Sequence, residues 1–142
     1  MTSRSSGFTL IELLVVVAIL GILSAVGVIA YSGYVKNAKI KSAENVMQKI
    51  GLANTENYSD YGVYWAQSTS LCSPTEATSQ EIEKILLGNT ETERKFITDD
   101  INFYMCVWGD GTTFDVVAKS NDGGNCTLKL NADLGITRAN CN

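Results

Sequence analysis

Hydrophobic residues dominate the first quarter of the chain, and polar residues are mixed in only after it. From Leu13 to Val35 there are 23 residues without a charge. An α-helix rises about 1.5 Å per residue, so this stretch is long enough to cross a hydrocarbon core of about 30 Å. The pattern predicts a membrane-compatible N-terminal helix and a water-soluble part that begins near Lys36.

The next stretch, residues 36–57, has the spacing of an amphipathic helix. Its apolar positions recur every three or four residues, which places them on one face, while lysines and Glu44 fall elsewhere. We expect this helix to continue the apolar one as a single rod. The alternative is a separate surface helix after a break near Gly33. The residues expected on the buried face are Ile40, Ala43, Met47 and Ile50.

Beyond a loop at 59–75, a short second helix is expected. Thr78 and Glu81 have the spacing of a capping box, and Gly88 can end a helix after Leu87.

The last third of the chain alternates between apolar and polar positions, as β-strands do. We expect strands at 101–108, 113–119 and 126–130, separated by the glycine-containing turns 109–111 and 121–125. Such a sheet needs a cover for its apolar face, and the amphipathic helix can supply it. The predicted fold class is therefore α+β, with a long N-terminal helix packed on a small antiparallel sheet.

The amino-acid composition argues against several classes of function. The chain has 142 residues, with 11 Lys plus Arg against 15 Asp plus Glu, and it has no histidine. Histidine-based catalysis and metal ligation are excluded, and no nucleophile motif is present. We therefore expect no enzyme activity, no cofactor and no small-molecule substrate, although serine–lysine chemistry stays formally open. The net charge of -4 gives no basic surplus for nucleic acid, so nucleic-acid binding is not indicated.

The N-terminus differs from an ordinary secretory signal, in which the cleavage site follows the apolar region. Here the small residue Gly7 precedes that region, and a cut after it would leave the apolar helix on the mature chain. The simpler alternative is a signal anchor that is never cut. Glu12 argues against it, since a carboxylate at a membrane centre costs about 2.5–3.5 kcal/mol and usually has a partner. Phe8, whose amine the cut would free, lies four residues before Glu12, on the same helix face.

These residues carry a resemblance to a known family. The stretch Gly7-Phe8-Thr9-Leu10-Ile11-Glu12 resembles the prepilin peptidase site of type IV pilins and of the related type II secretion pseudopilins. The resemblance implies a cut between Gly7 and Phe8, N-methylation of Phe8 and a role for Glu12 with Phe8 in subunit assembly. The chain departs from many type IV pilins at Ile29, where they have a helix-kinking proline. The only helix breakers in this run are Gly21, Gly27 and Gly33.

The resemblance also implies an organisation: a leader at 1–7, a transmembrane and assembly helix at 8–35, and a globular domain at 36–142. The expected function is a structural subunit that polymerises into a helical surface pilus. Its expected partners are further copies of itself, the prepilin peptidase and the assembly machinery, and the inner membrane holds it before assembly. The alternatives are a periplasmic pseudopilin and a membrane-anchored extracytoplasmic domain that does not polymerise.

Four cysteines allow three pairings. We favour Cys72 with Cys106 and Cys126 with Cys141. The second pair would bound the segment 126–141, which resembles the C-terminal disulfide-bounded region of type IV pilins. An even count at wide spacing favours disulfides over thiols. It also favours a pilus over a pseudopilus, whose major subunit commonly lacks disulfides and has a calcium loop.

No metal site is expected. Asp110, Asp122 and Asn125 are the candidates for calcium, but they have no EF-hand spacing and read as turn residues.

The flanking charges give an ambiguous topology. Lys36, Lys39 and Lys41 follow the apolar run and would place that end in the cytoplasm by the positive-inside rule, against the single charge of Arg4. Oxidised cysteines require the opposite orientation, with the leader inside and the domain outside, and the family implies the same.

Overall fold

The computed structural model describes residues 7–89 and 95–141. The chain divides into two compact units, Met1–Ala38 and Lys39–Asn142. The elements, in chain order, are α1 (Leu10–Tyr61), α2 (Glu76–Ile85), the π-helical turn η1 (Phe96–Asp100), β1 (Phe103–Gly109), β2 (Phe114–Ser120), β3 (Thr127–Asn131) and β4 (Ile136–Ala139).

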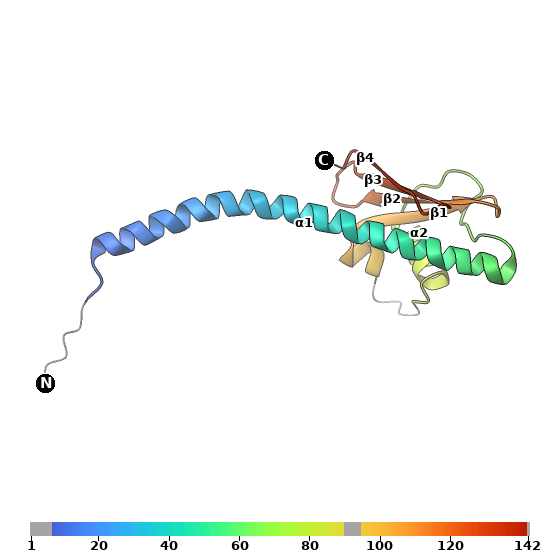
Figure 1. Cartoon of the computed structure of the whole chain (residues 1–142), viewed down its shortest axis with the longest axis horizontal. Helices are drawn as coiled ribbons and strands as arrows, with labels where there is room; N and C mark the ends of the chain where they lie inside the picture. The colour runs from blue at the N-terminus through green and yellow to red at the C-terminus, as the bar shows by residue number, and fades with distance from the viewer. Residues whose placement is uncertain (1–6, 90–94, 142) are drawn as a thin grey trace, which may run out of the picture. The chain divides into compact units, whose positions relative to one another are not determined.

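α1 is one uninterrupted helix, so the break considered near Gly33 is absent (Figure 1). From Leu10 to Tyr34 its apolar side chains are exposed, with Leu10 88% accessible. Within the described residues, α1 is the one helix whose length and composition suit a membrane span. Its two serines in this part donate their hydroxyls to the helix itself, Ser24 to the Leu20 carbonyl at 2.7 Å and Ser32 to the Ile29 carbonyl at 2.9 Å. Both serine hydroxyls are therefore paired within the helix.

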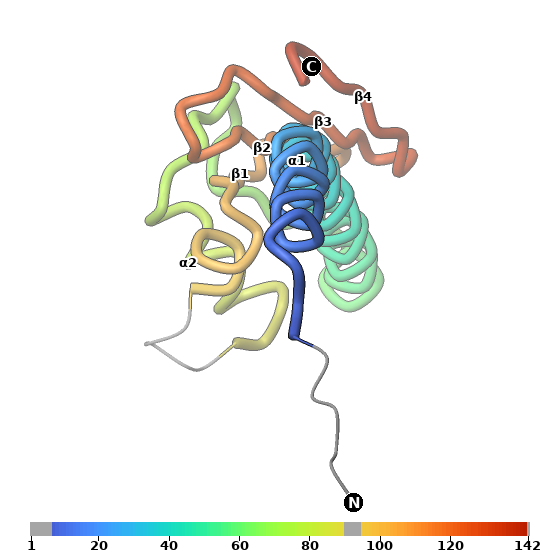
Figure 2. Tube along the Cα trace, turned by 90° about the vertical axis from the view of Figure 1, so that its left-hand side faces the viewer, coloured from blue at the N-terminus to red at the C-terminus, as the bar shows by residue number. Residues whose placement is uncertain are grey.

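The second unit contains a four-stranded antiparallel sheet in the order β1-β2-β3-β4. The α+β fold, with a long helix packed on this sheet, is confirmed. Three of the strands match the expected ones to within two residues at either end, whereas β4 was not predicted. Seen along α1, the strands follow one another across the helix, and α2 lies on the β1 side (Figure 2).

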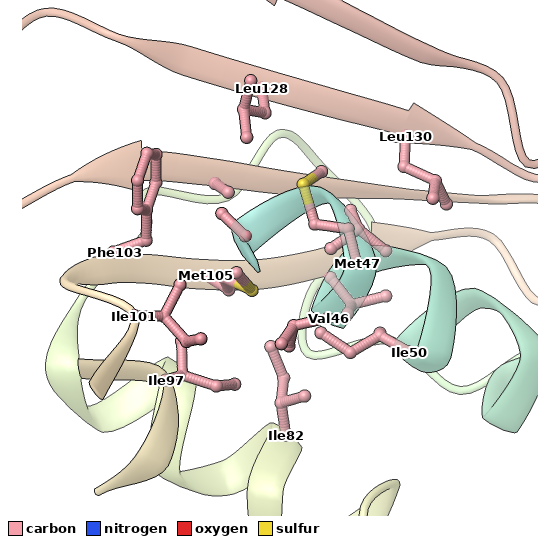
Figure 3. Close-up of a cluster of buried hydrophobic side chains, with 14 of the residues drawn as sticks. Val46, Met47, Ile50, Ile82, Ile97, Ile101, Phe103, Met105, Leu128 and Leu130 are labelled. Atoms are coloured by element: carbon pink, nitrogen blue, oxygen red, sulfur yellow. The ribbon is translucent and has the colours of Figure 1, made fainter. Parts of the chain in front are cut away.

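The core lies between α1 and the sheet (Figure 3). The four helix positions expected on the buried face, Ile40, Ala43, Met47 and Ile50, are all buried. Gly51 allows an especially close approach, because a Cβ there would lie 2.6 Å from Leu134 Cδ2 and 3.3 Å from Leu130 Cδ2. The sheet side chains that complete the core include Phe103, Met105, Val107, Leu128 and Leu130.

The position predicted for the second helix was wrong by about three residues at its start. Thr75 is the N-cap, and Thr78 occupies the third helical position of the capping box, with Thr78 N donating to Thr75 Oγ1 at 3.2 Å. Glu81, expected to complete the box, instead accepts a 2.8 Å hydrogen bond from Gln67 Nε2. Thr75 and Thr78 are three residues apart, and either could have been the N-cap of this helix. Glu81 does not take part in the capping box, because its carboxylate binds Gln67 instead.

The two edges of the sheet differ. Beside β1, Gln67 N donates to the Val107 carbonyl at 3.0 Å, and Gly109 N donates to the Ser68 carbonyl at 2.9 Å. Asn54, which is fully buried on α1, holds this loop in place: its Oδ1 accepts from Trp65 N at 2.7 Å and its Nδ2 donates to the Trp65 carbonyl at 3.0 Å. At the other edge, no strand among the described residues pairs with the outer side of β4.

Two disulfides link Cys72 to Cys106 and Cys126 to Cys141, which is the pairing favoured above. The first ties the loop before α2 to β1. The second joins the start of β3 to the chain just beyond β4, so that the hairpin is closed covalently.

Candidate functional site

The first turn of α1 brings Glu12 back onto the residue that precedes the helix. Glu12 Oε2 accepts hydrogen bonds from Thr9 N at 2.8 Å and from the Thr9 hydroxyl at 2.7 Å. In return, Glu12 N donates a hydrogen bond to Thr9 Oγ1 at 3.4 Å. This reciprocal arrangement is a capping box, and it places a negative charge at the positive end of the helix dipole.

Thr9 was not singled out from the sequence, although its signal was present. Thr9 and Glu12 have the T-x-x-E spacing directly before an apolar run, which marks a helix N-terminus. The same spacing argument was applied to Thr78 and Glu81, where it failed. At the N-terminus it identifies how the Glu12 carboxylate is held.

The cap leaves part of the carboxylate available. Glu12 Oε1 has no partner among the described residues, and the side chain borders a shallow hollow of about 400 Å³. Phe8, 81% accessible, borders the same hollow, so the structure brings Phe8 and Glu12 together. Gly7 precedes them, exposed and outside any helix or strand, and a Cβ on it would meet nothing within 4 Å. The hollow is lined by Phe8, Ile11, Glu12, Val15 and Val16.

Chemically, this arrangement has the features of a polar contact point within an apolar surface. It offers one anionic oxygen inside an apolar surface, which can accept an ammonium group from another molecule. In a membrane or a packed bundle an unpaired carboxylate is unfavourable, so such an oxygen favours association with a cation.

The acidic residues considered as calcium ligands instead accept hydrogen bonds within turns. Asp110 Oδ1 accepts from Thr112 N at 2.9 Å, from the Thr112 hydroxyl at 2.7 Å and from Thr113 N at 3.0 Å. These hydrogen bonds hold the pKa of Asp110 below its ordinary value. Asp122 Oδ1 accepts from Gly124 N at 3.0 Å in the next turn. The described part of the chain contains no group of histidine, cysteine or acidic residues able to hold a metal ion.

A second polar cluster joins α1 to the C-terminal hairpin. Glu44, which is buried, accepts a hydrogen bond from Arg138 Nε on β4 and pairs with Lys41 Nζ at 3.2 Å. The Arg138 guanidinium and then Lys41 hold the pKa of Glu44 below its ordinary value, against the opposing effect of burial. This cluster was not predicted, because 94 positions separate Glu44 from Arg138.

Known proteins resemble this chain over the same N-terminal residues that form the first turn of α1. The family described as the prokaryotic N-terminal methylation motif matches residues 2–28. A fimbrial protein of Neisseria meningitidis serogroup A is 30% identical over 125 residues, which cover 87% of this chain and 71% of the relative. The chain belongs to the type IV pilin family.

Other relatives extend the similarity of this pilin over most of its length. The type IV major pilin protein PilE of Neisseria gonorrhoeae is 29% identical, with 87% of this chain and 72% of the relative covered. The type IV major fimbrial protein FimA of Dichelobacter nodosus is 28% identical, with 79% and 90% covered. No solved structure matches the chain. The prepilin motif and the exposed apolar helix are consistent with a pilin anchored in a membrane before assembly.

Proposed function

We propose that this pilin is the structural subunit of a type IV pilus. The chain is cut between Gly7 and Phe8, methylated on the new amine of Phe8, and polymerised through the first half of α1 into a helical surface filament. Residues 8–35 then form the membrane and assembly helix, and 36–142 form the globular domain. The partners are a prepilin peptidase, the assembly machinery and further copies of the chain.

The observation that carries the proposal is the contrast between the two halves of α1. Its second half buries one face against the sheet, while its first half exposes its apolar side chains from Leu10 to Tyr34 and carries one acidic group, Glu12. Such a helix needs lipid or other helices around it. Because lipid is as apolar as leucine, exchanging one for the other gains little, and packing with polar pairing must supply the specificity.

Glu12 supplies that pairing. Its free oxygen accepts the amine of Phe8 from a neighbouring copy, and a buried polar pair of this kind fixes the axial register between helices. The small residues on the helix let backbones approach closely. They are Ala18, Gly21, Ser24, Ala25 and Gly27.

The test is peptide mass spectrometry on filaments sheared from cells, beside the membrane fraction. Abundant chains in the sheared fraction that begin at N-methylated Phe8 support the proposal. Chains that begin at Phe8 but stay in the envelope favour a periplasmic pseudopilus instead. If Met1 is retained throughout, the helix is an uncut anchor and the proposal fails.

A further inference from the structure

In the second unit, one face of α1 points away from the sheet and stays exposed. Its positions recur every three or four residues, at 45, 49, 52, 56 and 60. They lie opposite the buried face that contains Met47 and Ile50 (Figure 3). All of them belong to one compact unit, Lys39–Asn142. Leu52, at the middle of this exposed face, is 58% accessible. The face is therefore open to contact with another molecule.

Charge is ordered along this exposed face. Lys49 comes first, and Glu56 and Asp60 follow it by seven and eleven residues. At 1.5 Å per residue, the carboxylates lie about 10.5 and 16.5 Å beyond the lysine, whereas side chains of one helix pair when they are three or four residues apart. None of the three side chains has a hydrogen-bond or ion-pair partner among the described residues. The opposite charges on this face therefore do not compensate each other within one chain.

A second copy of the chain, displaced along the helix, would bring these charges together. If its α1 runs parallel and is displaced by seven to eleven residues, its Lys49 lies level with Glu56 or Asp60 of the first copy. The parallel direction follows from the proposed function, in which every copy enters the membrane in the same way. Because each copy uses different residues toward its two neighbours, the contact is head-to-tail, and the same displacement can repeat along an open filament.

We propose that the exposed face of α1 from Asn45 to Asp60 is a second assembly surface, on which Lys49 pairs with Glu56 and Asp60 of a neighbouring parallel copy. The inference rests on the proposed function for the direction of the copies, and it adds their axial displacement. Glu56 and Asp60 are four residues apart on one face, so either carboxylate receives the lysine when the other is removed. Exposed ion pairs contribute little singly, so the contact sets the displacement and leaves most of the stability to the apolar helix.

The test is disulfide trapping of the full chain in whole cells, with copper phenanthroline as the oxidant. The four natural cysteines are already paired, so only introduced cysteines react. N45C/L52C and Q48C/S59C place two cysteines seven and eleven residues apart on exposed positions of α1. Within one helix these separations are too great for a disulfide, so every new bond joins two copies.

We expect at least one of these two pairs to give a ladder of dimers, trimers and larger species. The matched control is N45C/S59C, on the same exposed positions but fourteen residues apart, which should give at least about fivefold less of the ladder.

An exchange of charges tests the pairing itself. In the cysteine pair that gives the ladder, Lys49→Glu should reduce the ladder about fivefold, and K49E/E56K/D60K should restore it. Lys84→Glu, which reverses an exposed lysine on α2, should leave the ladder unchanged.

Three outcomes would overturn the inference. Neither pair could give a stronger ladder than N45C/S59C, or the exchange of charges could fail to restore the ladder. In the third, the single variant L52C forms the dominant dimer, which indicates an antiparallel pair centred on Leu52. Failure of the proposed function is read separately, from the absence of sheared wild-type filaments, because trapping in whole cells also detects neighbouring copies in the membrane.

Discussion

Glu12 accepts two hydrogen bonds from Thr9 through a single oxygen, Oε2, and leaves Oε1 without a partner among the described residues. One carboxylate can therefore cap its own helix and still bind an amine from another chain. The two tasks can be separated by mutation.

Substitution Glu12→Ala should leave cleavage largely intact and abolish filaments, because the neighbouring amine loses its anionic partner. The measurements are the mass of the chain in the membrane fraction and the yield of sheared filaments. Glu56→Ala, which removes an exposed carboxylate from the other half of α1, should assemble normally.

Thr9→Ala tests the cap alone, because it removes the hydroxyl and keeps the carboxylate. We expect filaments at reduced yield. If Thr9→Ala abolishes assembly as completely as Glu12→Ala, helix capping explains the phenotype and the pairing role is wrong.

Gly7→Leu should block cleavage, since the peptidase site of the family requires a small residue before the cut. The measured mass should then be that of the precursor. Gly27→Ala, inside the apolar helix where a Cβ meets nothing within 4 Å, should give the mature mass. A mature-sized Gly7→Leu chain would contradict the proposed cleavage site.

Asn54→Ala should lower the free energy of unfolding by about 3 kcal/mol, because it leaves two backbone groups of Trp65 unpaired at a fully buried position. Urea denaturation of the full chain in detergent measures this change. Asn45→Ala makes the same chemical change at an exposed position of the same helix and should cost less than about 0.5 kcal/mol. Equal losses would show that Asn54 contributes only helix propensity.

Glu44 should make the second unit sensitive to acid. The Arg138 guanidinium lowers the pKa of Glu44 in the folded state, so its contribution is complete above the ordinary carboxyl pKa. It is lost as the pH falls through the lowered, folded-state pKa. Glu44→Gln should cost about 1 kcal/mol at neutral pH and flatten the fall in stability on acidification. Glu56→Gln should retain the wild-type pH profile in the same urea titrations.

The two disulfides should differ modestly in their contribution. They join residues 34 and 15 positions apart, for which loop entropy predicts about 3.8 and 3.0 kcal/mol. The double variants C72S/C106S and C126S/C141S, compared by urea denaturation, should differ by about 0.7 kcal/mol. A larger loss for the shorter loop would mean that packing at Cys126, and not chain entropy, dominates.

Sequence periodicity was sufficient for the elements that bury a continuous face. The helix positions Ile40, Ala43, Met47 and Ile50 and three strands followed from spacing alone. β4 could not be recognised, because it has four residues and only Ile136 is partly buried. η1 was also missed, because its start depends on a distant group: Ile97 N donates to Glu83 Oε1 at 2.6 Å.

The candidate site divides in the same way. Gly7, Phe8 and Glu12 stand out by residue type and order, and Thr9 was recognisable from its spacing to Glu12. The contact between Glu44 and Arg138 required the tertiary fold, since nothing local pairs two residues on α1 and β4.

The unequal edges of the sheet bear on how copies of this pilin can meet. A sheet edge with free backbone groups recruits strands from other chains and leads to aggregation. Here the loop at 64–68 occupies one edge, and the other is a strand of four residues whose end is fastened through Cys141. Neighbouring copies of the chain therefore find few free backbone groups at the sheet edges with which to form β-sheet hydrogen bonds. In the proposed filament, growth uses the helix surface, where contacts depend on side chains and can be undone without unfolding the domain.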